Sequence, residues 1–211
     1  MQILGLDPGA SSTGFARVSI TDNREIKPEE YGTISIIEAH FLDTYKWIIA
    51  YIAQHAIQLI GYEIAFFGKQ NFQPPPEKIA TVQVQGIIEL IGEEYGVSVQ
   101  SWNAVSVRSS ICGGNAKKPQ VRTAIQKLLH MPTAIKDKDA VDALAVACCT
   151  ASRMYGARWP VRGFQEPLQF APPKKKKKKV DISQLTDEQI QLLASQNRLI
   201  YDGNKIAGVK P

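Results

Sequence analysis

Three short apolar runs near the start of the chain predict three consecutive β-strands. Residues 3–7 are mostly apolar and end in the turn sequence Asp-Pro-Gly, and two further apolar-rich runs occupy residues 14–20 and 31–37. The polar link between the second and third runs is short enough for a hairpin. The first three strands are therefore expected to form an antiparallel meander.

Helical spacing of apolar positions dominates the middle of the chain. It predicts helices over residues 38–60, 77–95, 119–129 and 138–155, with strands at 61–67 and 97–102 in the first two gaps. Strands joined through a helix usually pair in parallel, because the connection must cross over the sheet. We therefore expect an α/β fold of the RNase H-like class, with a mixed five-stranded sheet and helices on both faces.

The composition changes after about residue 165. Residues 1–165 are expected to form one folded domain and residues 166–180 a linker rich in proline and lysine. Residues 181–211 form a short extension with one helix candidate, Thr186 to Gln196. The linker holds six consecutive lysines, Lys174–Lys179, which cannot fold on themselves because like charges repel. The fold is therefore expected to carry a basic C-terminal tail.

Overall composition and charge narrow the class of protein. The 211 residues are 44% hydrophobic and 21% charged, which is ordinary for a globular domain. The chain is too short for a protein of two large lobes. The net charge of +5 is smaller than the charge of the lysine run alone, so the body of the chain is close to neutral. Charge by itself therefore does not establish a polyanionic partner.

The cysteines and the N-terminus bear on location. Cys112, Cys148 and Cys149 lack CxxC spacing and are expected to be reduced thiols. The first ten residues show no basic segment followed by an apolar one, and the apolar stretch 41–60 is interrupted by polar side chains. We therefore expect a cytoplasmic protein with no membrane partner.

Four carboxylates stand where a site could form. Asp7 ends the first strand, and Glu63 lies within an otherwise apolar strand, where an unpaired carboxylate is costly. Asp139 and Asp142 are three residues apart, so they share one face at the start of an apolar helix. Each could instead have a plainer role: a turn residue, a solvent-facing strand position, or compensation of the helix dipole.

These four side chains would repel one another if they converged, and a cation would be needed to keep them ionised. Ligand sets made only of oxygen favour hard ions, so Mg²⁺ is expected, with Mn²⁺ as a substitute. Two such ions about 4 Å apart would clamp the attacking and leaving oxygens of a phosphodiester. The pattern therefore favours phosphodiester hydrolysis with two metal ions per active site.

Four motifs follow one another along residues 1–156: ILGLDPGASSTGFA at the first strand, E-x-x-F from Glu63, GGNAKKPQV from Gly113 and DKDAVDALAVA from Asp137. This series resembles the RuvC family of Holliday junction resolvases, the crossover junction endodeoxyribonucleases. The resemblance implies an RNase H-like homodimer that acts in DNA recombination and repair. It would nick four-way DNA junctions symmetrically with Mg²⁺, leaving 5′-phosphate and 3′-hydroxyl ends.

The resemblance also implies roles for single residues. Lys118 matches a catalytic basic residue near the scissile phosphate. Phe66 is similar to an aromatic residue that stacks on bases at the junction, and Arg108 takes the place of a lysine that contacts DNA. The family's catalytic, metal-binding carboxylates match Asp7, Glu63, Asp139 and Asp142.

Residues 113–118 favour DNA binding on physical grounds as well. Gly113 and Gly114 permit close approach of the backbone to a phosphate, and Lys117 and Lys118 lie just before a helix N-terminus. An ordinary basic turn would show the same residues. The lysine run of the tail is open to two similar interpretations, contact with DNA arms outside the cleft or a solvated linker.

The predicted helix at 77–95 is the candidate interface of the homodimer. Small Gly86 would let a second helix approach closely along its apolar positions, and a two-fold dimer suits a junction with approximate two-fold symmetry. A helix buried in the core would show the same pattern. The apolar positions are Ile79, Val82, Leu90 and Tyr95.

Other functions compete with this hypothesis. A phosphotransferase of the sugar-kinase type holds phosphate at a similar strand turn, but it needs two lobes. A non-catalytic junction-binding protein would have no use for four carboxylates facing DNA. A broader nuclease of the same family, acting on flaps or forks, fits the residues as well. A branch-migration motor as a further partner stays open.

Overall fold

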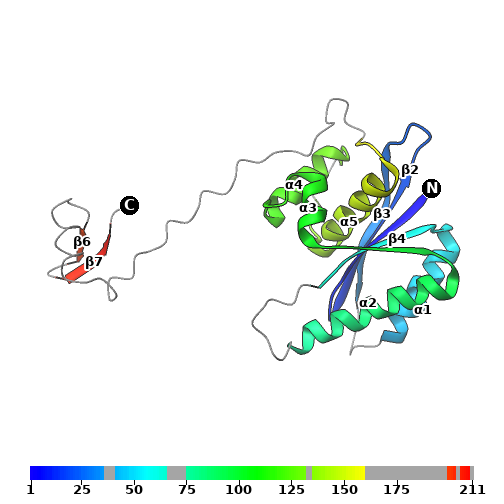
Figure 1. The fold of residues 1–211 in the computed structure, drawn as a ribbon, viewed down its shortest axis with the longest axis horizontal. Helices are drawn as coiled ribbons and strands as arrows, with labels where there is room; N and C mark the ends of the chain where they lie inside the picture. The colour runs from blue at the N-terminus through cyan, green and yellow to red at the C-terminus, as the bar shows by residue number, and fades with distance from the viewer. Residues whose placement is uncertain (36–40, 66–74, 132–134, 160–198, 203–204, 210–211) are drawn as a thin grey trace. The chain divides into compact units, whose positions relative to one another are not determined.

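The computed structural model describes residues 1–35, 41–65, 75–131, 135–159, 199–202 and 205–209. Five strands form one sheet in the order β3-β2-β1-β4-β5 (Figure 1). β1, β2 and β3 pair antiparallel, whereas β4 and β5 run parallel to β1, so the predicted mixed sheet is confirmed. The strands are β1 Gln2–Pro8, β2 Ser12–Ile20, β3 Ile26–Ser35, β4 Leu59–Glu63 and β5 Ser98–Trp102.

Helices cover both faces of this sheet, as predicted (Figure 1). Leu4 and Leu6 of β1 pack on the side of α1 and α2, whereas Ile3 packs in a second core on the side of α3, α4 and α5. This division follows from the strand geometry, because successive side chains point to opposite faces. The helices are α1 Phe41–His55, α2 Pro76–Tyr95, α3 Ala104–Ile111, α4 Lys118–Leu128 and α5 Lys138–Tyr155.

Glycines bring α5 directly onto the sheet. A Cβ atom at Gly5 of β1 would come 2.5 Å from the backbone oxygen of Ala143, and one at Gly14 of β2 would collide with the backbone of Asp139. Only residues without a side chain permit this approach. The first turn of α5 is therefore held over the ends of β1 and β2.

The structure corrects three sequence-based boundaries. α3 was not predicted at all, although Asn103 caps it by accepting a hydrogen bond from the Ser106 backbone N–H at 2.8 Å. α1 ends at His55 instead of continuing to residue 60, because Ala56 has a left-handed φ of 49° and β4 begins soon after. β4 ends at Glu63, so Glu63 is the last residue of its strand and not an interior one as predicted.

The chain divides into two compact units, Met1–Pro172 and Pro173–Pro211. Within the second, the structure describes an antiparallel hairpin of β6 (Leu199–Asp202) and β7 (Lys205–Val209), which the sequence pattern did not predict. The lysine run and the helix candidate 186–196 lie outside the described residues. The predicted bounds at residues 165 and 180 stay predictions. In the part of the chain that the structure describes, no helix has the length and apolar character to cross a membrane.

Candidate active site

Asp7 and Glu63 lie side by side on the face of the sheet that α5 covers. Along β1, alternation places Asp7 on the same face as Gly5, which touches α5. Along β4 it places Glu63 on the same face as Gly61, where an added Cβ would meet α5. β1 and β4 are parallel, so both carboxylates stand at the carboxyl ends of neighbouring strands.

The first turn of α5 adds the other two carboxylates. The Asp137 side chain caps the helix by accepting hydrogen bonds from the backbone N–H groups of Asp139 (3.0 Å) and Ala140 (3.3 Å). Asp139 in turn accepts a 2.8 Å hydrogen bond from the Ser12 hydroxyl of β2. Asp142 lies one turn further along, on the face that packs against the sheet, and is mostly buried.

Lys118 brings a positive charge into this group of carboxylates. Its ammonium donates a hydrogen bond to Oδ2 of Asp142 and forms an ion pair with it. The start of α4 holds the lysine in place, because Pro119 fits the first turn and the Lys117 backbone N–H donates to the Gln120 side chain at 2.8 Å. The Lys118 side chain is 72% exposed, so the cation faces solvent as well as the carboxylates.

The pKa shifts show that the four carboxylates act on one another. The pKa of Asp7 is raised to about 7, first by burial and then by the negative charges of Asp142, Glu63 and Asp139, which Lys118 offsets only in part. The pKa of Glu63 is also raised, by burial and by the charge of Asp142. These four residues therefore form one electrostatic cluster, which we call the carboxylate cluster.

The carboxylate cluster also raises the pKa of Lys118, which favours the charged form of the lysine. Burial lowers its pKa, but the hydrogen bond to Asp142 and the negative charges of Asp142, Asp7 and Glu63 outweigh burial. The net pKa of the ammonium is raised, so Lys118 stays protonated at neutral pH. The cluster thus contains its own counter-cation.

Only some of the other residues predicted to contact DNA lie near the carboxylate cluster. Arg108, in the last turn of α3, is close enough for its charge to lower the pKa of Glu63. Gly113 has a φ of 100°, which favours glycine, and the space beside it is open. Gly114 packs against Ser109 and Val105, and Lys117 is exposed. Phe66 lies outside the described residues.

The carboxylate cluster has the chemistry of a metal site. Across the described segments, no three Asp, Glu, His or Cys side chains are arranged as a finished metal site. Two of the four carboxylates are instead bound to other groups, Asp142 to Lys118 and Asp139 to Ser12. The donors are all hard oxygens, and a cation would relieve the repulsion by Asp142, Glu63 and Asp139 that adds to burial in raising the pKa of Asp7. A hard divalent cation therefore fits the donor set.

Two residues beside the cluster are not among the site residues that the sequence predicts. Ser12 is the first residue of β2, and its hydroxyl donates a hydrogen bond to Asp139. Gln85 of α2 is 7% exposed and donates a 3.2 Å hydrogen bond to the backbone oxygen of Glu63. A polar residue between apolar positions on the buried side of a helix was the signal available for Gln85.

Comparison with known proteins agrees with this architecture. Solved structures of Thermus thermophilus RuvC superpose with TM-scores of 0.63 for the protein alone and 0.62 for its complex with a Holliday junction substrate. Their sequences are 19% and 17% identical, and each match covers 76% of this chain and all of the other. At this level of identity, the structures establish that the fold is shared.

Sequence comparison settles the family. The protein of Syntrophotalea carbinolica, a crossover junction endodeoxyribonuclease RuvC, is 31% identical over 156 residues, covering 72% of this chain and 94% of the relative. That of Caldicellulosiruptor saccharolyticus is 28% identical over 155 residues, covering 71% and 91%. The family model for crossover junction endodeoxyribonuclease RuvC matches residues 3–150. The resemblance seen in the motifs is thus confirmed, and the chain belongs to the RuvC family of crossover junction endodeoxyribonucleases.

Proposed function

We propose that this protein is a metal-dependent endonuclease that resolves four-way (Holliday) DNA junctions by paired symmetric nicks. The observation that carries the proposal is the carboxylate cluster at the carboxyl ends of β1 and β4 and the start of α5, with Lys118 at its solvent side. Relatives that cover the same part of the chain are named crossover junction endodeoxyribonucleases. One protein with the same fold has been solved with a Holliday junction.

The cluster would hold two Mg²⁺ ions, for which Mn²⁺ can substitute. The ligands would be Asp7, Glu63, Asp139 and Asp142, and the ions would activate water and stabilise the charge that develops on the phosphate. Cation binding favours ionised Asp7, which burial otherwise holds at a pKa of about 7. Ser12 and Lys118 hold the two aspartates of α5, Asp139 and Asp142, beside the position that the ions would occupy.

Lys118 would act on the phosphate directly. Its raised pKa keeps the ammonium charged, and its exposed end can donate to a non-bridging phosphate oxygen. Attack by water forms a new P–O bond while the bond to the 3′ oxygen breaks, with the proton passing from the water to the departing oxygen. The products are a 5′-phosphate and a 3′-hydroxyl, ends that a ligase can rejoin.

Residues around Lys118 would orient the DNA. Lys117 is exposed beside it, and Arg108 lies near Glu63, so both can neutralise phosphates next to the scissile one. Gly113 and Gly114 form the adjacent turn, where open space at Gly113 permits a close backbone approach. Phe66 would stack on an unpaired base, which is worth about 1–3 kcal/mol.

A homodimer would place two such sites on a two-fold symmetric junction. The face of α2 predicted as the interface is exposed: Leu90 by 57%, Ile79 by 46%, Tyr95 by 45% and Val82 by 39%. Apart from the backbone of α2 itself, no atom of the described residues lies within 4 Å of a Cβ built on Gly86. These residues are therefore no part of the core of this chain, which supports their assignment to the interface.

The three cysteines are unpaired and buried, which supports a reducing, cytoplasmic location.

A panel of labelled DNA substrates tests the proposal. A synthetic four-way junction, a flap and a plain duplex are each incubated with the full-length protein in Mg²⁺, in Mn²⁺ and in EDTA, beside the Asp7→Asn variant. The proposal expects nicks on the junction alone, absent in EDTA and in the variant. Equal cutting of the flap would instead favour the broader branched-DNA nuclease. Tight junction binding without cutting in either metal would favour a structural binder.

A further inference from the structure

The outward side of α4 presents a basic surface with no opposite charge of its own. Residues 117–130 contain no aspartate and no glutamate. Val121, Ala124, Ile125 and Leu128 turn the apolar side of the helix into the core. The remaining positions include the basic residues Lys117, Lys118, Arg122, Lys127 and His130. Such an acid-free surface is suited to a polyanion.

The carboxyl end of this surface is hollowed. A shallow depression of about 480 Å³ is lined by Thr123, Gln126, Lys127, His130 and Met131. The side-chain Nε2 of Gln126 is buried beneath it, without a hydrogen-bond partner among the residues that the structure describes. The Thr123 hydroxyl already donates to the Pro119 carbonyl, so the donors that a ligand in the depression can reach are the exposed Lys127 and His130.

We propose that this depression, lined by residues 123–131, is a phosphate subsite for an arm of the branched DNA. The inference rests on the proposed function and extends it to a contact away from the cleavage site. A phosphodiester offers several acceptor oxygens, one negative charge and no proton to donate, which matches these donors. A contact of this kind positions the DNA without reading its sequence.

The position of α4 connects the subsite to the reaction centre. Lys118 begins the helix beside the carboxylate cluster, and Lys127 lies nine residues on. At about 1.5 Å per residue the two are about 14 Å apart along the axis, which equals about four base steps of duplex. Nine residues are about two and a half turns, so the two side chains leave opposite sides of α4, and an arm held at Lys118 reaches the depression by crossing the outward side of the helix.

A DNA phosphate suits this place better than a free anion does. The depression lies at the carboxyl end of α4, where the helix dipole is negative and disfavours an isolated small anion. A phosphate of a bound arm is held nearby at high effective concentration, which offsets that disadvantage. The donors can then contribute a positional contact even though they would bind inorganic phosphate weakly.

Junction affinity as a function of salt tests the subsite. The full-length protein and its Lys127→Gln and Lys46→Gln variants are titrated against a labelled four-way junction in EDTA. Lys46 is an exposed lysine of α1, on the other face of the sheet, and serves as the control for the same charge change. We expect Lys127→Gln to weaken binding roughly three- to tenfold and to lower the salt slope by about one per protomer. Equal behaviour of the two variants overturns the inference.

A neutral phosphate locates the contact. Methylphosphonate is introduced one position at a time, three to six nucleotides from the nick site on one arm. At one position it should weaken binding by the wild-type protein but add no further loss in Lys127→Gln, whereas Lys127→Arg should restore the wild-type response. Additive losses at every position overturn the inference.

A phosphate titration and a cleavage assay distinguish a DNA contact from a free-anion site. Chemical-shift changes at Lys127 and His130 with inorganic phosphate, unaffected by a bound junction, would assign the depression to a free anion and overturn the inference. Junction cleavage is followed in parallel: Lys127→Gln should raise the protein concentration needed for half-maximal cleavage, whereas Lys46→Gln should not. If the wild-type protein neither binds nor cuts the junction, the proposed function fails, and the subsite fails with it.

Discussion

Gln85 of α2 donates a hydrogen bond from its side-chain Nε2 to the backbone oxygen of Glu63, at 3.2 Å. This bond fixes the end of β4 at the point where the chain leaves the sheet. The opposite side of the same helix is the exposed apolar face assigned to the dimer. One helix thus supports a carboxylate of the cluster on its inner side and carries the proposed dimer face on its outer side.

Loss of the Gln85 donor is expected to affect chemistry more than binding. Gln85→Met keeps the volume but leaves the Glu63 carbonyl without its partner, at a cost of about 1–2 kcal/mol in unfolding free energy. Glu63 would then be positioned less precisely, which should lower kcat roughly ten- to hundredfold while junction affinity stays near wild type. The control is Tyr62→Phe, which removes a hydrogen bond to Glu89 one residue earlier. If kcat falls equally in both variants, the hydrogen bond from Gln85 does not position Glu63 for catalysis.

Asp7 makes the stability of the metal-free protein depend on pH. Its pKa is about 7 in the folded protein and near 4 when unfolded, so the unfolded state loses its proton first as pH rises. The contribution of Asp7 to stability is therefore fully present below pH 4 and is lost as pH rises through 7. Asp7→Asn removes this loss, so its unfolding free energy in EDTA at pH 8 should exceed that of wild type by a few kcal/mol at most. The variant should therefore melt at a higher temperature.

The same comparison at low pH and with metal completes the Asp7 test. At pH 4 the carboxyl is protonated in the folded protein, and thermal melts of the two proteins should nearly coincide. Addition of Mg²⁺ at pH 8 should stabilise wild type much more than Asp7→Asn, because the ionised carboxylate gains a cation. A constant difference at all pH values would show that Asp7 is not the titrating group.

Lys118 is expected to matter for both cleavage and metal binding. Lys118→Met removes the cation that neutralises Asp142, and cleavage at saturating Mg²⁺ should fall about a hundredfold or more. The apparent affinity for Mg²⁺, measured by calorimetry without DNA, should rise, because no ammonium then competes for the cluster. Lys46→Met, a matched change on α1, should alter neither quantity. Unchanged Mg²⁺ affinity in Lys118→Met would contradict the competition.

Disruption of the α2 face should separate the protomers. Leu90 is 57% exposed, and Leu90→Glu places a charge on the face assigned to the dimer. Sedimentation should show half the wild-type mass with unchanged circular dichroism, and paired nicking should be lost. Met154→Glu is the control, because Met154 is also an exposed apolar side chain but lies near the end of α5. Dissociation by Met154→Glu and not by Leu90→Glu would move the interface to another surface.

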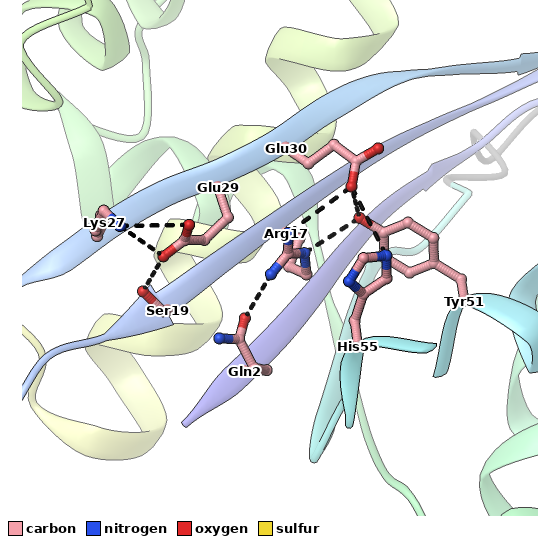
Figure 2. A network of polar contacts seen from close by, with 8 residues as sticks. All are labelled: Gln2, Arg17, Ser19, Lys27, Glu29, Glu30, Tyr51 and His55. Carbon is pink, nitrogen blue, oxygen red and sulfur yellow. Dashed lines mark hydrogen bonds and ion pairs between the residues drawn. The ribbon is translucent and has the colours of Figure 1, made fainter. Parts of the chain in front are cut away.

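A polar network at the other end of the sheet provides a purely structural comparison (Figure 2). Arg17, Tyr51 and His55 converge on the Glu30 carboxylate, with the Tyr51 hydroxyl donating at 2.7 Å. Burial and this bond raise the pKa of Tyr51 to about 12. Tyr51→Phe should cost about 1 kcal/mol of unfolding free energy, measured by urea titration, with junction cleavage unchanged. A loss of cleavage would imply that the network reaches the active site.

The sequence pattern predicted most of the fold because its signals are local. Alternation and helical spacing located the five strands and four of the helices within a few residues. α3 was missed because its eight residues carry too few apolar positions to show a period, although Asn103 provided a capping signal. The hairpin of β6 and β7 was missed because its strands are short.

The site was only partly predictable for a different reason. The four carboxylates and Lys118 could be named from their motifs, and the strand pairing that places Asp7 beside Glu63 followed from the expected sheet. The ion pair of Lys118 with Asp142 and the bond from Ser12 to Asp139 join residues 24 and 127 positions apart. Such contacts depend on the docking of α4 and α5, which no local pattern encodes.

The most direct test of the central claim is a map of the nicks on all four strands of a mobile junction, followed by treatment with DNA ligase. We expect two nicks at symmetry-related positions in strands of the same polarity, both resealed by ligase, and none with Asp7→Asn. Nicks in a single strand, nicks at unrelated positions, or ends that ligase cannot rejoin would contradict resolution by a two-fold dimer that leaves 5′-phosphate and 3′-hydroxyl ends.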